Sequence, residues 1–438
     1  MLPILQINNE MDRRRIDQLI GRLGDQAGGD SQLAEQVAKI VEDVRTEGDQ
    51  ALVRYMRRWT DPDFREDGIR VEAESLAAAE KKLDASVKQS LQRSIDHVRA
   101  YQQHVMPTDP PPISIDGAEL SMRFTPIRRA GLHVPGGRAA YPSSVIMLAV
   151  PAQVAGVQEL SVVCPPPTGG GGDVSDLVLG VCSMLKIQNV FRIGGAQAIA
   201  ALAFGTETVR PVDLIAGPGN AYTQQAKRQL FGTVGIDGFF GPSEVVVLVD
   251  GSADPRWVAA DLLAQAEHDP GCCFLIATDL KAIEQVAEAA REQLPNRKRR
   301  EAIESALRDF SAAILVDSDR QANELVDRFA AEHVTLAVAD PKQRLEQLSN
   351  GGAWFLGDAT PVASGDYYAG PSHCLPTGTT ARFSSGLSVY TFLKRSSVET
   401  YPEGLDDRSI EDIAAIAEAE GLDAHAHSVR IRGAKSPK

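Results

Sequence analysis

The stretch that decides the fold is "EVVVLVDGSADPRWVAADLLAQAEHDPGCCFLIAT", residues 244–278. It begins with a β-rich apolar run and ends with another, and a well-delimited helix lies between them. Asp254 can cap that helix and Pro255 suits its first position, while the residues Asp269-Pro270-Gly271 stop it. A strand, a helix and a second strand in this order predict a parallel sheet covered by helices.

The same alternation extends in both directions along the chain. Downstream, the strand-like runs are "AAILVD", "VTLAVA" and "AWFLG", and the expected helices span residues 280–293, 320–331 and 341–349. Upstream, the strand-like runs are "ELSVVCPP", "NVFRIGG" and "VDLIAG". We therefore expect an α/β protein with two doubly wound Rossmann-like parallel-sheet domains, at residues 119–242 and 243–375.

The two ends of the chain differ from this pattern. Residues 1–118 have apolar side chains at helical spacing and predict a helical N-terminal region. Its two helical stretches are Gln32–Arg58 and Glu72–His104, and the prolines of "MPTDPPPISIDG" end it. Residues 376–438 form a small C-terminal tail, with a helix expected at Ile410–Glu420 and a strand at "SVRIR".

Composition excludes several classes of protein. A net charge of −14 over 438 residues argues against nucleic acid as a partner. The most apolar segment, residues 145–157, is interrupted by Pro151 and Gln153, so no membrane span is expected. Five cysteines without CxxC spacing and an N-terminus without a signal-peptide pattern predict a cytoplasmic protein.

A candidate metal site lies on the helix before the two adjacent cysteines. Gln265 and His268 share one helix face and can point at a single ion, although such a pair is more often a surface hydrogen bond. Cys272 and Cys273 begin a strand, where neighbouring side chains face opposite ways, so they are expected to be core and edge residues rather than ligands.

Other candidates lie at element ends. Glu332 and His333 are adjacent in "FAAEHVTL", where a carboxylate and an imidazole can share acid–base work if the helix stops there. The alternative is a solvated helix end. A loop rich in glycine and proline holds Asp366 and His373, and the tail holds Glu420, His425 and His427.

Two glycine turns follow strand-like runs of the first α/β domain, in "IGGAQAIAALAFG" and "AGPGNAY". Turns at such positions bind ligands in doubly wound folds, although each signal alone is weak. The run "PPPTGGGGD" lacks the Lys-Ser/Thr of a phosphate-binding loop and is interpreted as a surface loop.

Taken in order, these segments resemble the histidinol dehydrogenase family from about Arg123 to Arg432. The resemblance rests on "GLHVPGGRAAYPSSVIMLAVPAQVAG", "GGAQAIAALAFGTETV", "DLIAGPGNAY", "GPSEV", "DLLAQAEH", "GDYYAGPSHCLPT", "ARFSSGL" and "EGLDAHAHSVRIR". The family implies a zinc-dependent homodimer that oxidises L-histidinol to L-histidine through the aldehyde, with NAD as oxidant.

The resemblance also implies residue roles. The metal ligands would be Gln265, His268, Asp366 and His425. Glu332 and His333 would be the acid–base pair, and Ser243, His373 and Glu420 would contact substrate. His133, Gln197 and Asn220 would lie at the cofactor. Glu420 and His425 would act in trans, in the site of the other subunit.

The chain departs from the family at a few positions. His133 stands where the family usually has Tyr, Ala331 where it has Pro, and His427 where it has Asn. None of these removes an acid, a base or a metal ligand, but the first puts one cofactor contact in doubt.

The expected topology also predicts where the site lies. The helices that precede His268 and Glu332 run antiparallel to their strands, so Gln265, His268, Glu332 and His333 converge at one sheet edge. That edge holds the strand N-termini, opposite the usual ligand edge of an α/β sheet, and predicts a cleft against another domain or chain.

Two alternatives remain from the sequence. One is a related zinc and NAD dehydrogenase acting on another primary alcohol, such as a sulfonated diol. The other is an inactive, metal-stabilised assembly protein, which the presence of Glu332 and His333 argues against.

Overall fold

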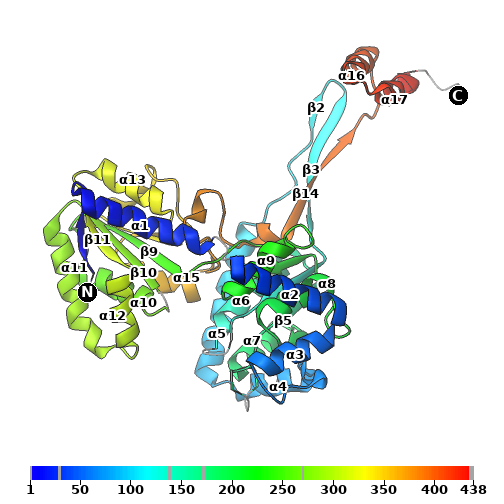
Figure 1. Cartoon of the computed structure of the whole chain (residues 1–438). Coiled ribbons are helices and arrows are strands. Elements are labelled where there is room, and N and C mark those ends of the chain that lie inside the picture. Colours follow the sequence, from blue (N-terminus) through cyan, green and yellow to red (C-terminus); the bar gives the residue numbers. More distant parts are fainter. Residues whose placement is uncertain (1, 28–30, 137–139, 170–172, 269–270, 434–438) are drawn as a thin grey trace. The chain divides into compact units, whose positions relative to one another are not determined.

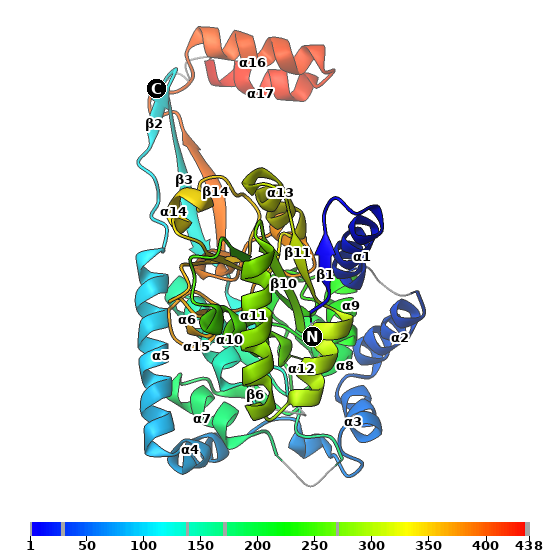
Figure 2. The same cartoon turned by 90° about the vertical axis from the view of Figure 1, so that its left-hand side faces the viewer.

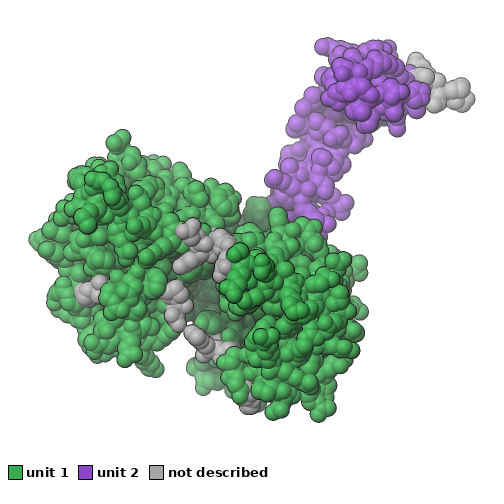
Figure 3. All heavy atoms as spheres, viewed as in Figure 1, with its two compact units in different colours: residues 1–105, 127–392 green, residues 106–126, 393–438 purple. Residues whose placement is uncertain are grey.

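The computed structural model describes residues 2–27, 31–136, 140–169, 173–268 and 271–433. The chain divides into two compact units, coloured separately in Figure 3. Unit 1 comprises residues 1–105 and 127–392, and unit 2 comprises residues 106–126 and 393–438.

Unit 1 contains two parallel sheets (Figure 1). The five-stranded sheet has the order β6-β5-β4-β7-β8. Its strands are β4 (Arg129–His133), β5 (Glu159–Val163), β6 (Asn189–Phe191), β7 (Leu214–Ala216) and β8 (Gly235–Ile236).

The six-stranded sheet has the order β1-β11-β10-β9-β12-β13. Its strands are β1 (Ile4–Gln6), β9 (Ser243–Val249), β10 (Gly271–Ala277), β11 (Ala312–Leu315), β12 (His333–Ala337) and β13 (Ala353–Leu356). Apart from β1, both sheets place their strands in the chain order 3-2-1-4-5. This is the doubly wound Rossmann order, so the expected fold class is confirmed.

Helices cover both faces of the five-stranded sheet. One face carries α8 (Gly195–Phe204) and α9 (Ala221–Leu230), with α2 (Ser31–Glu47) and α3 (Asp49–Trp59) packed on them. The other helices of this half are α4 (Ala73–Lys82), α5 (Ala85–His104), α6 (Pro142–Ala155) and α7 (Asp176–Met184), which lie together in Figure 2.

The six-stranded sheet is enclosed in the same way. Val245, Val247 and Cys273 pack toward α10 (Pro255–Ala266), α11 (Leu280–Gln293) and α12 (Arg300–Asp309). Val246, Leu248 and Cys272 pack toward α1 (Glu10–Ala27) and α13 (Asp319–Phe329). The adjacent cysteines therefore do face opposite ways, but both are buried in core rather than one at an edge.

The remaining short elements of unit 1 are α14 (Pro341–Leu345), α15 (Val362–Tyr367), η1 (Glu66–Gly68), η2 (Leu294–Asn296), η3 (Thr380–Arg382) and η4 (Val389–Phe392).

Unit 2 is an antiparallel ribbon with a helical hairpin. The strands β2 (Ile113–Ile115), β3 (Ala118–Pro126) and β14 (Leu393–Thr400) form a sheet in the order β14-β3-β2. The helices α16 (Asp407–Ala419) and α17 (Asp423–Gly433) pack through small side chains: Ala414, Ala417 and Ala426.

The structure corrects some expectations about the chain ends. The strand expected at "SVRIR" is wrong, because these residues form the last part of α17, which packs on α16 instead of pairing with a strand. The N-terminal region includes β1, which pairs with β11 in the six-stranded sheet. Residue 119, the expected start of the first α/β domain, lies inside β3 of unit 2.

The two expected N-terminal helices are each divided. Gly48, with φ +56°, separates α2 from α3, because this left-handed conformation cannot continue a helix. Asp84 caps α5 by accepting hydrogen bonds from Ser86 N and Val87 N, so a new helix starts within the second stretch.

Candidate functional site

Several of the predicted site residues meet at the N-terminal edge of the six-stranded sheet. Ser243 begins β9, and His333 begins the neighbouring β12 with Val245 as its register partner. Asp254 caps α10 by accepting from Arg256 N, and this helix runs back to place Gln265 in its last turn. Of the residues predicted to converge at this edge, Gln265 and His333 lie there, and so does Glu332, which accepts a hydrogen bond from Ser243.

The end of α13 explains how Glu332 and His333 can serve one site. The helix stops at Phe329 because Ala330 adopts a left-handed conformation with φ +42°. Glu332 therefore lies in the turn and His333 in the strand, rather than diverging around a helix. Both side chains are buried.

A chain of hydrogen bonds links Gln265 to Glu332 through Ser243. Gln265 Nε2 donates to Ser243 Oγ at 2.7 Å, and Ser243 Oγ donates to Glu332 Oε2 at 2.6 Å. The backbone N–H of Glu244 donates to the same carboxylate oxygen at 3.2 Å. Burial raises the pKa of Glu332, and the charge of His333 and the bond from Ser243 oppose that shift.

His333 stands between two carboxylates. Its Nδ1 lies 3.5 Å from Glu332 Oε2 and 3.3 Å from the carbonyl oxygen of Glu244, and its Nε2 lies 3.7 Å from Asp366 Oδ1. Burial alone would lower the pKa of His333, but the negative charges of Glu332 and Asp366 outweigh it and raise the pKa to about 9.

Asp366 and His373 extend this network to the other half of unit 1. His373 Nδ1 donates to the carbonyl oxygen of Asp366 at 3.0 Å, and its Nε2 lies 3.3 Å from Ser144 Oγ on α6. Burial raises the pKa of Asp366, but the neighbouring imidazole of His333 outweighs it and leaves the pKa lowered. Burial also lowers the pKa of His373, which favours a neutral imidazole.

The expected metal ligands are distributed over both units. Gln265 is buried and His268 is exposed just beyond α10, close enough to Asp366 to affect its titration. His425 lies exposed on α17 of unit 2, and Glu420 ends α16 there. Among the described residues, no three His, Cys, Asp or Glu side chains form a ready metal cluster.

The chemistry of the donors in unit 1 nevertheless suits a divalent ion. Because Gln265 uses its amide nitrogen to bind Ser243, its amide oxygen is left to act as a ligand. An amide oxygen, an imidazole and a carboxylate are a donor set compatible with zinc. The neighbours Asp269 and Pro270, which were expected to stop α10, lie outside the described residues.

The five-stranded sheet has its own pocket, at the edge where its strands end rather than begin. A cavity of about 400 Å³ lies where β4 and β7 end, and both Gln197 and Asn220 line it. Its other lining residues are Trp59, Thr60, Gly136, Pro165, Pro166, Thr168, Gly194, Gly195, Ala196 and Tyr222. This is the switch point of a doubly wound sheet, where dinucleotides bind.

Local interactions fix the loops around this pocket. Asn220 caps α9 by accepting from Thr223 N at 3.1 Å. The fully buried pair Lys227 and Asp237 holds the preceding turn, since Lys227 Nζ donates to the Gly217 carbonyl at 3.1 Å. These polar contacts at the base of the loop were not anticipated from the sequence.

His133 lies at the end of β4, beside the same turn. Its Nδ1 donates to the carbonyl oxygen of Pro218 at 2.6 Å, so Nε2 carries the lone pair. Burial lowers the pKa of His133 to about 4, which keeps the ring neutral. Nε2 is buried without a partner among the described residues, so an acceptor is available at this position.

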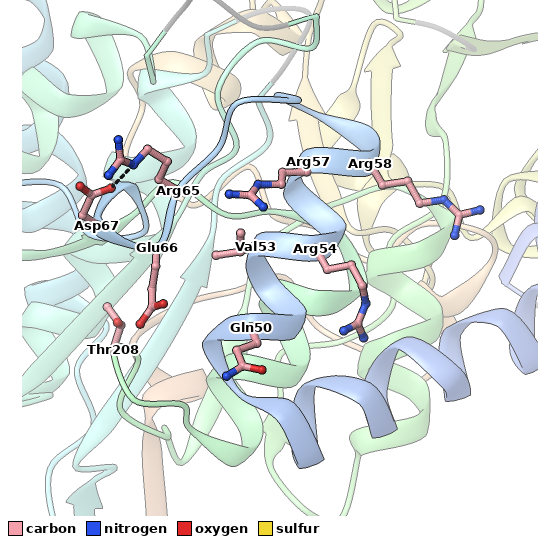
Figure 4. A pocket seen from close by; sticks show the side chains of 9 residues that line it. All are labelled: Gln50, Val53, Arg54, Arg57, Arg58, Arg65, Glu66, Asp67 and Thr208. Carbon is pink, nitrogen blue, oxygen red and sulfur yellow. Dashed lines mark ion pairs between the residues drawn. The ribbon is translucent and has the colours of Figure 1, made fainter.

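A separate hollow of about 1090 Å³ lies beside α3 (Figure 4). Four arginines line it, but acidic neighbours neutralise part of their charge. Arg54 pairs with Glu47 and with Asp43, and Arg65 lies 3.5 Å from Asp67. We assign no chemistry to this open and partly self-paired surface.

Sequence reasoning missed Glu244 and Ser144 at the site. Glu244 is fully buried beside Glu332, and Ser144 faces His373. A charged residue at the start of the apolar run "VVVLV" was the one available signal for Glu244, because charges are rarely buried in such a strand without a role.

Comparison with known proteins places this arrangement in context. Residues 25–433 match the model of the histidinol dehydrogenase family. A histidinol dehydrogenase of Mesorhizobium japonicum is 48% identical over 402 residues, which cover 90% of this chain and 92% of the relative. One of Synechococcus is 46% identical over 404 residues, covering 90% and 91%.

A solved structure is similar over the whole length. The crystal structure of histidinol dehydrogenase from Elizabethkingia anophelis matches with a TM-score of 0.90 and 31% identity, covering 98% of each chain.

Proposed function

Because the chain belongs to the histidinol dehydrogenase family and so oxidises histidinol in histidine biosynthesis, we propose that it does so with zinc and NAD. The proposed reaction converts L-histidinol to L-histidine in two oxidations, through an aldehyde that stays bound. The observation that carries this proposal is a polar series at one sheet edge. Gln265, Ser243 and Glu332 are joined by hydrogen bonds, and His333 lies between the carboxylates of Glu332 and Asp366.

The metal would be held by Gln265, His268 and Asp366, with His425 from the other subunit. When bound, zinc would supply a Lewis-acidic anchor that orients the imidazole and amine of the substrate. Ser243, His373 and Glu420 would contact the substrate around it. The polar network that fixes Gln265 and Asp366 supports this, because ligands need partners that hold their orientation.

His333 is the proposed base for both oxidations. A metal held by Asp366 would offset the negative charge that raises the pKa of His333 and so favour the neutral ring. The neutral imidazole would take the proton of the alcohol as hydride leaves for the cofactor, with Glu332 and Asp366 orienting the ring. Glu332 would then accept a proton from water as that water adds to the aldehyde, while His333 returns its proton to the carbonyl oxygen. The product is the hydrate, and His333 is again free to act as base in the second hydride transfer. The bonds from Ser243 and Glu244 keep the Glu332 carboxylate in place for its task.

NAD is proposed to bind in the cavity at the end of β4 and β7. Gln197 and Asn220 line that cavity, and His133 would offer its free Nε2 to a donor on the cofactor. Gly195 has a positive φ of +68°, which residues with side chains rarely adopt, and a Cβ atom at Gly194 would clash with Pro165. Glycine is therefore required at both positions, as it is in turns that bind a dinucleotide.

A homodimer is proposed as the working form, with Glu420 and His425 acting in trans. Both lie exposed in unit 2, at the end of α16 and on α17, where they are accessible to another subunit. We further propose a cytoplasmic location. Among the described helices, none is long and apolar enough to cross a membrane.

Counting NADH formed per L-histidinol, with and without a chelator, tests the proposal. The expected result is two NADH per substrate, lost on removal of the metal and restored by zinc. One NADH per substrate, or turnover that survives complete metal removal, would contradict it. The rival primary alcohols are tested in the same assay, and the family match favours histidinol over a sulfonated diol.

A further inference from the structure

Glu244 is a carboxyl group behind the proposed catalytic pair that no step above uses. It is the second residue of β9 and is fully buried. Its backbone N–H donates to Glu332 Oε2 at 3.2 Å, and its carbonyl oxygen accepts from His333 Nδ1 at 3.3 Å. The backbone of one residue therefore touches both proposed catalytic side chains.

The side chain of Glu244 holds a different segment. Its Oε1 accepts from the N–H of Gly378 at 3.0 Å, in the loop that follows His373. Gly378 and Thr379 both have positive φ, +64° and +63°. A β-branched residue in this conformation is strained, so an interaction must maintain it. Arg382 Nε supports the same turn by donating to the Thr379 carbonyl at 2.9 Å.

The second oxygen of Glu244, Oε2, is buried and has no partner among the described residues. The titratable groups around Glu244 are Cys272 on β10, Glu332 just before β12, and His333 at its start. An ionised carboxylate with one unpaired, buried oxygen beside a second carboxylate is costly. Burial first, and the charge of Glu332 second, raise the pKa of Glu244 to about 8.

We propose that Glu244 is a positioning residue for the oxidation: as a neutral carboxylic acid it fixes the strand start that holds Glu332 and His333, and ties the His373 loop to it. This inference rests on the proposed function of Glu332 and His333. Of the two carboxyl groups, Glu332 is better placed to carry a negative charge, because Ser243, the Glu244 N–H and the imidazole of His333 contact it. Ionisation of Glu244 would place a second negative charge beside Glu332 and would disturb the positions of Glu332 and His333.

The test compares pH profiles of the full-length zinc enzyme. Glu244→Gln stays neutral at every pH and keeps an oxygen for Gly378, so its kcat and KM at pH 7 should lie within about threefold of the wild type. Above pH 8 the wild type should lose activity as Glu244 ionises, and the Gln variant should lack that loss. Glu244→Leu removes the acceptor and should lower kcat about tenfold or more at every pH.

Glu80→Gln is the matched control. The side chain of Glu80 binds Lys88 and Ser183, which are distant in sequence from β9 and β12. The activity of Glu80→Gln should therefore fall above pH 8 as that of the wild type does. An alkaline limb that is unchanged in Glu244→Gln would overturn the inference, as would a Glu244→Leu enzyme with wild-type kcat.

A spectroscopic measurement separates this inference from the proposed function. The infrared difference between wild type and Glu244→Gln should contain a protonated carboxyl band at pH 7 that disappears above pH 8. This readout needs no turnover and therefore holds even if histidinol is not oxidised. A carboxylate band for Glu244 at pH 7 would overturn the inference alone, whereas a wild-type enzyme without NADH formation would overturn the proposed function alone.

Discussion

The two sheets of unit 1 have the same strand order but place their candidate functional residues at opposite edges. The five-stranded sheet has its cavity where β4 and β7 end, as doubly wound folds usually do. The six-stranded sheet gathers Ser243, Glu332 and His333 where its strands begin. Strand order alone therefore does not decide which edge of a sheet becomes a site.

The physical reason lies in the connections. In the six-stranded half, α10 runs back to the strand starts and places Gln265 there. The left-handed conformation of Ala330 ends α13 at Phe329, so that Glu332 lies in the turn before β12. In the five-stranded half, glycine turns before α8 and α9 open space at the strand ends. We infer that the acid–base and metal-binding residues lie at the strand starts of the six-stranded sheet, and that the cofactor binds at the strand ends of the five-stranded sheet.

The largest expected effect comes from removing Glu332, the residue proposed to activate water for hydration of the aldehyde. Glu332→Gln should lower the second oxidation by roughly 10²–10⁴ and the first one less, because water activation is needed only in the second. Turnover of added L-histidinaldehyde and of L-histidinol, each followed by NADH formation, measures the two steps. A variant that oxidises the aldehyde at the full rate would remove Glu332 from this role.

The next test asks whether unit 2 of one subunit supplies His425 to the metal site of the other subunit. Co-expressed Glu332→Gln and His425→Ala chains should regain roughly a quarter of wild-type activity if His425 acts in trans. About half of the dimers are mixed after random pairing, and one of the two sites in each mixed dimer is intact. Each variant alone should be nearly inactive. If mixed dimers form and remain inactive, His425 acts within its own chain.

A smaller effect is expected on stability, and it depends on pH. The unfolded chain releases the Glu244 proton near pH 4.5, whereas the folded chain holds it to about pH 8. Wild-type stability is therefore favoured at low pH and falls between these values. The Gln side chain of Glu244→Gln does not titrate. The free energy of unfolding of this variant, relative to that of the wild type, should therefore increase by on the order of a few kcal/mol between pH 5 and pH 8.

Chemical unfolding of both proteins at pH 5, 6.5 and 8 measures this difference. Glu80→Gln again serves as the control, because lysine and serine contacts lower the pKa of Glu80 instead of raising it. A constant difference between Glu244→Gln and wild type across this range would argue against a neutral Glu244 in the fold.

Much of this arrangement could be predicted from the sequence, because it depends on local signals. The caps of α10, the strand-like runs and the glycine turns predicted the two parallel sheets and the edge where Gln265 meets Glu332 and His333. The short strand β1 was missed, because three residues carry no periodicity and its pairing with β11 is distant in sequence. "SVRIR" was misread because alternation in five residues fits a helix packed through Ala426 equally well.

The partners of the site residues could not be predicted. Ser144 reaches His373 across 229 positions, and Glu244 reaches Gly378 across 134, so only the folded chain brings them together. The role proposed for His425 also requires a second chain. Spacing in the sequence indicates which residues can share a helix face or a strand, but not which loops meet.

The central claim, that the two edges hold different partners, is tested most directly by measuring zinc content and NAD⁺ affinity on the same preparations. Asp366→Ala should lose zinc on dialysis but bind NAD⁺ with near wild-type affinity. Asn220→Ala should keep zinc and bind NAD⁺ more weakly, with Asn220→Asp as the variant that retains the helix cap. If both variants lose both ligands to the same extent, the metal and the cofactor share one site and the account is wrong.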